Sequence, residues 1–196
     1  MKTFKYFGAL AAFPLLVAPV ASMAAEATSD SDSAQVAVNG SVARLCILGE
    51  PSQPVVDLGQ MAQTSGANVG RVAAISARTV TLPNSFCNFA GSVVSVTAGA
   101  LVGDSGGTPP AGFAKAVNYT ATASGWASGD AVVTTAAASD GSDPESTTFG
   151  GTQPDPKLAD IDVQLAGYTV PGNALLLAGN YTGLVTVTLG PVSISE

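Results

Sequence analysis

Residues 181–189, Tyr-Thr-Gly-Leu-Val-Thr-Val-Thr-Leu, carry the clearest strand pattern of this chain. The threonines occupy one parity of a two-residue period, Leu184 is the only exception, and the opposite parity is apolar: Tyr181, Val185, Val187 and Leu189. This alternation predicts a half-buried β-strand. Gly190 and Pro191 then interrupt the pattern, and no clear strand follows. We therefore expect a sheet edge, with a strip of apolar core beside it, that requires a partner.

The first residues of the chain predict a secretory signal peptide over residues 1–24. Lys2 and Lys5 give a positive start, and the apolar run over residues 7–20 is short for a membrane span. Small residues at Ser22 and Ala24 suit a cleavage site. An uncleaved membrane anchor is the alternative. After cleavage we expect no membrane insertion, so the chain would be exported.

The charge balance is acidic. The chain has 7 basic residues, two of them in the leader, which leaves five against 14 acidic residues and a net charge of about −9 for the mature chain. The sequence contains no basic cluster that could offset this repulsion. We therefore set aside binding to nucleic acid or to anionic membranes. The remaining length suits one domain with a sizeable core.

Cys46 and Cys87 are the only cysteines. In an exported chain a single disulfide between them is the default expectation. The chain has no histidine, so we predict no zinc site and exclude Ser-His and Cys-His catalytic pairs. We expect no cofactor, no metal site and no enzymatic activity.

Alternating segments recur at the spacing of an all-β antiparallel sandwich, and none has a sustained helical period. Besides the terminal strand, we predict strands at residues 54–60, 72–82, 92–98, 113–126, 131–136, 160–167 and 175–177. A turn at Pro83-Asn84-Ser85 is expected just before Cys87. The stretch over residues 34–42 also alternates. We interpret residues 25–40 as an N-terminal arm and residues 41–196 as the domain.

Two groups of side chains could form a site. Asp140, Asp143, Glu145 and Asp155 lie in residues 137–156, which we predict to be a long loop. They could serve glycoside hydrolysis or calcium binding, but we favour a solvated acidic loop. Aromatic residues at 113, 119 and 126 could stack on a sugar, but core packing is the simpler expectation.

The order of several motifs resembles the chaperone-usher fimbrial subunits (pilins) and the related spore-coat-U-like proteins. The motifs are Asn39-Gly40-Ser41-Val42 before Cys46, Val56-Asp57-Leu58-Gly59-Gln60, Thr79-Val80-Thr81-Leu82 before Cys87, and the ending from Gly179 to Leu189. The resemblance covers most of the mature chain in outline. The cysteine spacing also agrees with that of the family.

The resemblance implies an immunoglobulin-like antiparallel sandwich that lacks its last strand. A periplasmic chaperone, and then the arm of the next subunit, would fill the groove, with an outer-membrane usher directing assembly into a fimbria used in adhesion or biofilm formation. Carried over by position, the donor residues are Ala34, Val36, Val38 and Gly40. The acceptor groove is lined in part by Tyr181, Val185, Val187 and Leu189.

The sequence departs from the family at its end. Ser195 stands where an aromatic residue is common, and residues 190–194 extend past the apolar run. A self-completed sheet is therefore the alternative, in which residues 192–194 close the fold of a monomeric secreted binding module.

Overall fold

The computed structural model describes residues 33–142 and 145–191. The signal peptide expected at residues 1–24 and the tail at 192–196 lie outside the described residues. The chain divides into two units, Met1–Ser41 and Val42–Glu196. Residues 25–32 of the predicted arm lie outside the described residues, so from here on the arm means residues 33–41 of the first unit, and the body means the second unit. The arm forms neither helix nor strand, and its residues are exposed.

The body is all-β, as the sequence predicts, and its only helical segment among the described residues is the 3-10 turn Pro171–Asn173. No helix in the described part is long and apolar enough to cross a membrane. The strands are β1 (Cys46–Ile47), β2 (Arg78–Cys87), β3 (Ser92–Ala98), β4 (Leu101–Gly103), β5 (Phe113–Ala114), β6 (Ala116–Ser124), β7 (Ala131–Thr134), β8 (Ser146–Gln153), β9 (Lys157–Thr169), β10 (Leu175–Leu176), β11 (Tyr181–Thr182) and β12 (Val185–Pro191).

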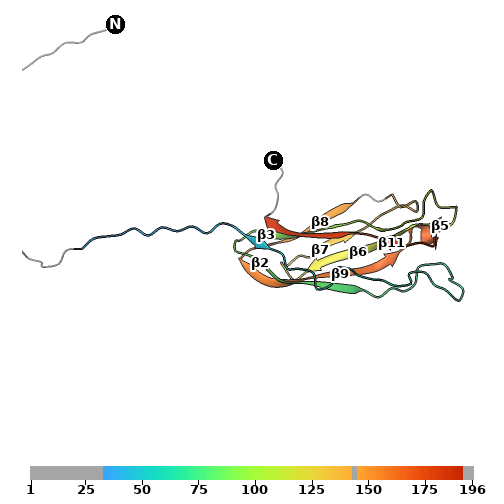
Figure 1. Ribbon diagram of the computed structural model, residues 1–196, viewed down its shortest axis with the longest axis horizontal. Helices are drawn as coiled ribbons and strands as arrows, with labels where there is room; N and C mark the ends of the chain where they lie inside the picture. The colour runs from blue at the N-terminus through green and yellow to red at the C-terminus, as the bar shows by residue number, and fades with distance from the viewer. Residues whose placement is uncertain (1–32, 143–144, 192–196) are drawn as a thin grey trace, which may run out of the picture. The chain divides into compact units, whose positions relative to one another are not determined.

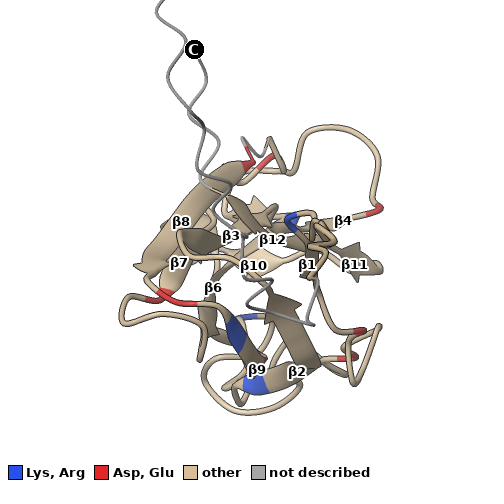
Figure 2. Ribbon diagram, turned by 90° about the vertical axis from the view of Figure 1, so that its left-hand side faces the viewer, with Lys and Arg blue, Asp and Glu red and all other residues tan. Residues whose placement is uncertain are grey.

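Two antiparallel sheets form the sandwich (Figure 1). The larger follows the order β1-β2-β9-β6-β4-β11, with β7 also paired to β6, and the smaller follows the order β12-β3-β8. An end view places β8, β3 and β12 in one layer and β6, β9 and β2 in the other (Figure 2). A short parallel pair, β10 with β5, stands apart from both sheets.

The core fills the space between the two sheets. Alternate residues of each strand point inward, so both inner faces contribute apolar side chains. Val96 and Ile161 are fully buried, and Trp126 is only 2% exposed. Tyr119 is likewise buried. The expectation that these aromatic side chains pack in the core is confirmed for Tyr119 and Trp126, which therefore cannot form a sugar-binding platform.

The predicted terminal strand is two strands in the structure. β11 pairs with β4 of the larger sheet, and β12 pairs with β3 of the smaller one. The chain changes sheets at Gly183, where an added Cβ would lie 3.0 Å from the carbonyl oxygen of Ala100 in the connection between β3 and β4, so this close main-chain approach favours glycine. β12 also continues through Gly190 to Pro191, which we had expected to interrupt it.

Residues 137–156 are not one long loop, because β8 occupies residues 146–153. The prediction failed because Gly150 and Gly151 remove the alternation. Their added Cβ atoms would each lie 2.9 Å from backbone atoms of Gly129. Glycine is required where two main chains approach this closely. The Gly151 N–H also donates to the Gly129 carbonyl at 2.7 Å.

Other boundaries also differ from those predicted. Residues 54–60 form no strand, because the Asp57 carboxylate accepts the Gly59 N–H at 2.8 Å in a turn whose Gly59 φ is +67°. β2 continues through the expected turn at Asn84 by a register shift between Leu82 and Ser85. β9 is longer than predicted, and the predicted strand over residues 113–126 is divided into β5 and β6 at Lys115.

Candidate functional site

An open groove lies beside β12. Its volume is about 380 Å³, and one of its walls is formed by Val185 and Val187 of β12, with Tyr181 to Leu184 continuing the wall. Val185 and Val187 are half-buried, whereas the intervening Thr186 is exposed. The predicted alternation of this strand is therefore confirmed, and Val185 and Val187 line a hollow on the side where they also pack against the core.

The floor of the groove is the inner face of the larger sheet. β2 contributes two apolar side chains, β9 contributes three and β6 contributes one: Val80, Leu82, Val163, Leu165, Tyr168 and Tyr119. Leu82, Val163 and Tyr119 belong to the main core cluster, and Leu165 and Tyr168 pack against it. The floor is part of the larger sheet, in which β2, β9 and β6 are successive neighbours.

The second wall is the segment over residues 51–58, which forms no strand. Ser52 holds it to β2 by two hydrogen bonds with Thr81: the Ser52 N–H donates to the Thr81 carbonyl at 2.8 Å, and the Thr81 N–H donates to the Ser52 Oγ at 3.0 Å. Val55 is 74% exposed on this wall. Across the groove, Leu184 is 68% exposed.

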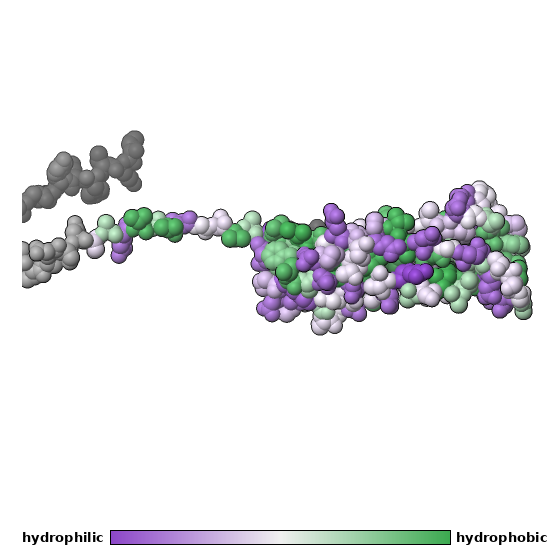
Figure 3. All heavy atoms as spheres, turned by 60° about the horizontal axis from the view of Figure 1, so that its bottom comes forward, coloured by the Kyte–Doolittle hydropathy of each residue, from purple (hydrophilic) through white to green (hydrophobic). Residues whose placement is uncertain are grey.

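The groove edge of β12 has no strand partner among residues 33–142 and 145–191. β12 pairs with β3 from Val185 to Pro191, and its sequence contains no charged residue. An exposed edge of this kind is a template for another strand, and natural proteins usually protect such edges with charges or by covering them. Apolar surface remains visible on the body and on the arm (Figure 3).

Three tyrosines gather around the groove. The Tyr119 hydroxyl donates to the Gly99 carbonyl at 2.8 Å, and its ring centroid lies 6.0 Å from that of Tyr168. The Tyr168 hydroxyl is buried and has no hydrogen-bond partner in the described part of the chain. Burial raises the pKa of both Tyr168 and Tyr181 above the ordinary tyrosine value. Both side chains line the groove in their neutral form at neutral pH.

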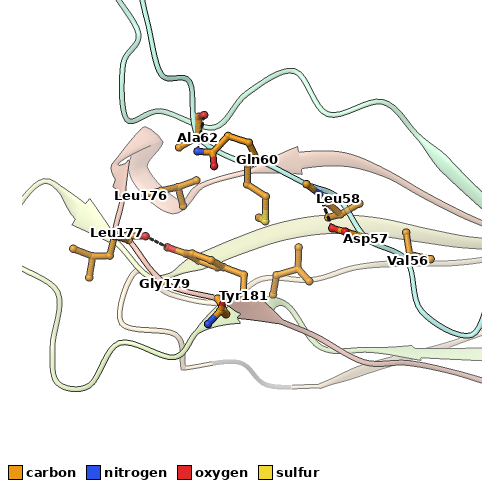
Figure 4. Close-up of a pocket in the computed structure, with 14 residues that line it drawn as sticks. Val56, Asp57, Leu58, Gln60, Ala62, Leu176, Leu177, Gly179 and Tyr181 are labelled. Carbon is orange, nitrogen blue, oxygen red and sulfur yellow. Dashed lines mark hydrogen bonds between the residues drawn. The ribbon is translucent and has the colours of Figure 1, made fainter.

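A second cavity continues from the groove past Tyr181. Its volume is about 510 Å³, and it lies between residues 56–62 and residues 176–181 (Figure 4). The Tyr181 hydroxyl donates to the Leu177 carbonyl at 2.8 Å, which fixes the ring at the junction of the two cavities. Val56, Leu58, Leu101 and Tyr181 line both cavities.

The first residues of the body are held tightly. Cys46 and Cys87 form the predicted disulfide, which joins β1 to β2. The Asn88 side chain accepts the Leu45 N–H and donates to the Ala43 carbonyl, both at 2.8 Å. The Arg44 guanidinium lies 4.0 Å from the ring centroid of Phe89. The point where the arm joins the body is therefore firmly anchored.

The predicted site residues fall into two separate places. Tyr181, Val185 and Val187 line the groove, whereas Leu189 packs against the main core cluster and is not part of its lining. Ala34, Val36, Val38 and Gly40 lie in the arm, with Val36 85% and Val38 91% exposed. Sequence reasoning missed the groove floor and the wall over residues 51–58. The alternating apolar residues of β2 and β9, which point inward, were the sequence pattern that could have identified the floor.

The acidic residues form no cluster that could hold a metal ion in the described part of the chain. Asp143 lies outside the described residues, and no group of three or more potential metal ligands occurs among the others. The Asp140 carboxylate accepts hydrogen bonds from the Ser142 N–H at 3.0 Å and the Ser142 hydroxyl at 2.7 Å. These bonds lower the pKa of Asp140 and fix it within a local turn.

Comparison with known proteins found no matching family model, no matching curated protein and no matching solved structure.

Proposed function

We propose that this chain is a structural subunit of a surface fimbria that assembles by donor-strand exchange. In this scheme the arm of one copy enters the groove of the next and pairs with β12. The observation that carries the proposal is the groove itself: an apolar floor, two walls and a strand edge without a partner in the described residues. Such a site binds an extended peptide by adding a strand to the sheet.

The arm has the chemistry that the groove requires. Residues 33–41 carry no charge, and Ala34, Val36, Val38 and Gly40 share one parity. Six residue steps separate Ala34 from Gly40 and also Val185 from Pro191, so each segment spans about 20 Å when extended. An arm running along β12 would place one apolar face on the groove floor and pair with the part of the strand, from Val185 to Val187, that lines the groove.

The energetic gain from this contact is substantial. Val36 and Val38 are almost fully exposed. Transfer of each valine side chain into an apolar site contributes roughly 1.5 to 3 kcal/mol. Hydrogen bonds to the β12 edge add to this term. Because the donating and accepting surfaces are different parts of the chain, the contact is heterologous and propagates from copy to copy as a filament.

Export and assembly follow from the same scheme. An apolar groove with an uncharged strand edge is an aggregation site until it is filled. The proposal therefore includes a periplasmic chaperone that covers the groove in transit, an outer-membrane usher that directs exchange, and a final position on the cell surface. Adhesion or biofilm formation would be the role of the assembled fibre.

The test uses charge placed on one or the other parity of the arm. In the full-length chain, V36D together with V38D puts two carboxylates on the donor face, whereas the matched variant Q35D with A37D puts the same charge on the opposite face. We expect the first variant to remain monomeric and the second to polymerise like the parent chain. Electron microscopy and size-exclusion chromatography measure the outcome.

A binding measurement separates failed donation from failed folding. The V36D/V38D chain retains its groove, so it should bind a fluorescent peptide of residues 33–41, measured by anisotropy. If the parent chain stays monomeric and its arm peptide does not bind, donor-strand exchange is wrong, and the monomeric secreted binding module with a self-completed sheet takes its place.

A further inference from the structure

The arm contains the only Asn-Gly pair of the chain. Asn39 precedes Gly40, whereas each of the other asparagines precedes a residue that has a side chain. Asn39 and Gly40 are both exposed and belong to no strand or helix. A Cβ built on Gly40 would have no neighbouring atom within 4 Å. The main-chain nitrogen of Gly40 is therefore sterically open to the side chain that precedes it.

We propose that Asn39 is a site of spontaneous deamidation, and that this reaction limits the time during which a free arm can donate. The chemistry depends only on residues 39 and 40. The consequence for donation rests on the function proposed above, because it concerns the arm as a donor strand.

The reaction needs water as its only co-reactant. The Gly40 main-chain nitrogen attacks the Asn39 side-chain carbonyl carbon and forms a new C–N bond. The side-chain nitrogen leaves as ammonia and carries away the proton of the attacking amide, which leaves a five-membered succinimide. Water then opens the ring at one of its two carbonyl carbons. One opening gives aspartate, and the other gives isoaspartate, in which the main chain runs through the former side chain.

The chain provides an internal comparison at Asp140-Gly141, a pair that can close the same ring with loss of water. There the Gly141 N–H donates to the Ala138 carbonyl at 3.0 Å, and Gly141 has a φ of +79°. Two hydrogen bonds from Ser142 hold the Asp140 carboxylate. The Gly141 N–H and the Asp140 carboxylate are thus both held by other hydrogen bonds, whereas Asn39 and Gly40 lie outside any strand or helix. Local order of this kind suppresses reactions that need the backbone to rearrange.

The products affect the arm unequally. Asn39 lies on the parity opposite to Val38 and Gly40, so an aspartate there would point away from the groove floor. Isoaspartate adds a methylene to the main chain and so breaks the alternation between Val38 and Gly40. Pairing along β12 would in turn hold residue 39 extended and protect it from reaction. Assembled subunits should therefore keep Asn39, and free subunits should lose it with time.

The test incubates the purified full-length chain at physiological temperature in mildly alkaline buffer. Isoaspartyl methyltransferase then transfers a labelled methyl group to isoaspartate, and peptide mass spectrometry locates the label. We expect residue 39 to react at least about tenfold faster than any other asparagine and faster than Asp140, a rate ratio worth about 1.4 kcal/mol of activation free energy. The N39Q variant, which keeps an amide, should stay unlabelled. A rate at Asn39 no higher than at the other asparagines overturns the proposal.

The effect of isoaspartate on donation by the arm is measured on the same aged sample. Polymer and free chain are separated, and isoaspartate at residue 39 should be several-fold depleted in the polymer, while aged N39Q should polymerise as well as fresh protein. Equal isoaspartate in both fractions overturns the effect on donation. If fresh protein forms no polymer at all, the proposed function and the effect on donation both fail, while the label at residue 39 still decides the chemistry.

Discussion

Cys46 and Cys87 are directly opposed partners in the β1–β2 ladder as well as a disulfide pair, with their Cα atoms 4.2 Å apart. β1 contains only two residues, and the unpaired groove wall over residues 51–58 follows shortly after it. The disulfide therefore fixes the start of the body to a ten-residue strand of the larger sheet. In the proposed fibre, tension on an arm would enter the body at this point.

Removal of the disulfide should lower the free energy of unfolding strongly. The cysteines are 41 residues apart, and closing a loop of that length restricts the unfolded chain by about 4 kcal/mol. We expect a loss of that order for the C46A/C87A double variant, measured by urea denaturation against the parent chain. A loss below about 1 kcal/mol would contradict the chain-entropy account.

Charge on the groove wall should block peptide binding without unfolding the body. V187D places a carboxylate in the groove, where binding of an apolar strand would bury it unpaired, so affinity for the arm peptide should fall by at least about a hundredfold, or 2.7 kcal/mol. T186D places the same charge on the exposed side of β12 and should bind nearly as the parent does. Anisotropy titration measures both. Equal affinities for the two variants would show that the peptide binds elsewhere.

The turn that leads from β1 to the groove wall requires a glycine. An added Cβ at Gly49 would lie in impossible contact with the Pro83 carbonyl oxygen of β2, whereas a Cβ at Gly190 meets nothing within 4 Å. We expect G49A to lower the free energy of unfolding by about 3 kcal/mol through overpacking. G190A should change it by less than about 0.5 kcal/mol. Similar values for the two variants would mean that the turn at Gly49 relaxes freely.

The core tryptophan depends on one serine. The Trp126 indole N–H donates to the Ser92 Oγ at 3.1 Å, and both residues are buried. S92A leaves this N–H without an acceptor, and the free energy of unfolding should fall by about 1 to 3 kcal/mol. The control is S124A, which removes only an exposed contact of 3.5 Å to Asp162. Trp126 fluorescence during denaturation reports the unfolding of both variants. A denaturation midpoint of S92A equal to that of the parent chain would refute the role of Ser92 as the acceptor for Trp126.

Stability should fall at alkaline pH because of the tyrosines beside the groove. Burial raises the pKa of Tyr168 and Tyr181 in the folded state above the unfolded value of about 10. Above that value the unfolded state loses protons first. The stabilising contribution is therefore complete below pH 10 and is lost as pH rises towards the folded-state pKa.

Phenylalanine at these two positions should weaken that dependence. Chemical denaturation across this pH range should show a shallower decline for Y168F and Y181F than for the parent chain. An identical slope in all three proteins would assign the alkaline effect to other groups.

The structure separates what was predictable from what was not. The alternation of β3, β9 and β12 identified these strands, because one parity of each strand is more buried than the other. β8 was missed because Gly150 and Gly151 have no side chains with which to show a period. Residues 54–60 were predicted as a short strand ended by glycine, but the turn at Asp57 and Gly59 removes them from pairing.

The amino-acid sequence alone determined that this protein is an all-β sandwich with one disulfide, because a two-residue period and the positions of two cysteines are local properties of the chain. It also determined that the arm alternates and that the last strand has an apolar face. Only the tertiary structure decided that this face lines an open groove. The floor and the second wall of the groove come from β2, β9 and residues 51–58. Segments so far apart in sequence meet only when the sheets pack, and no local pattern encodes the gap that packing leaves between them.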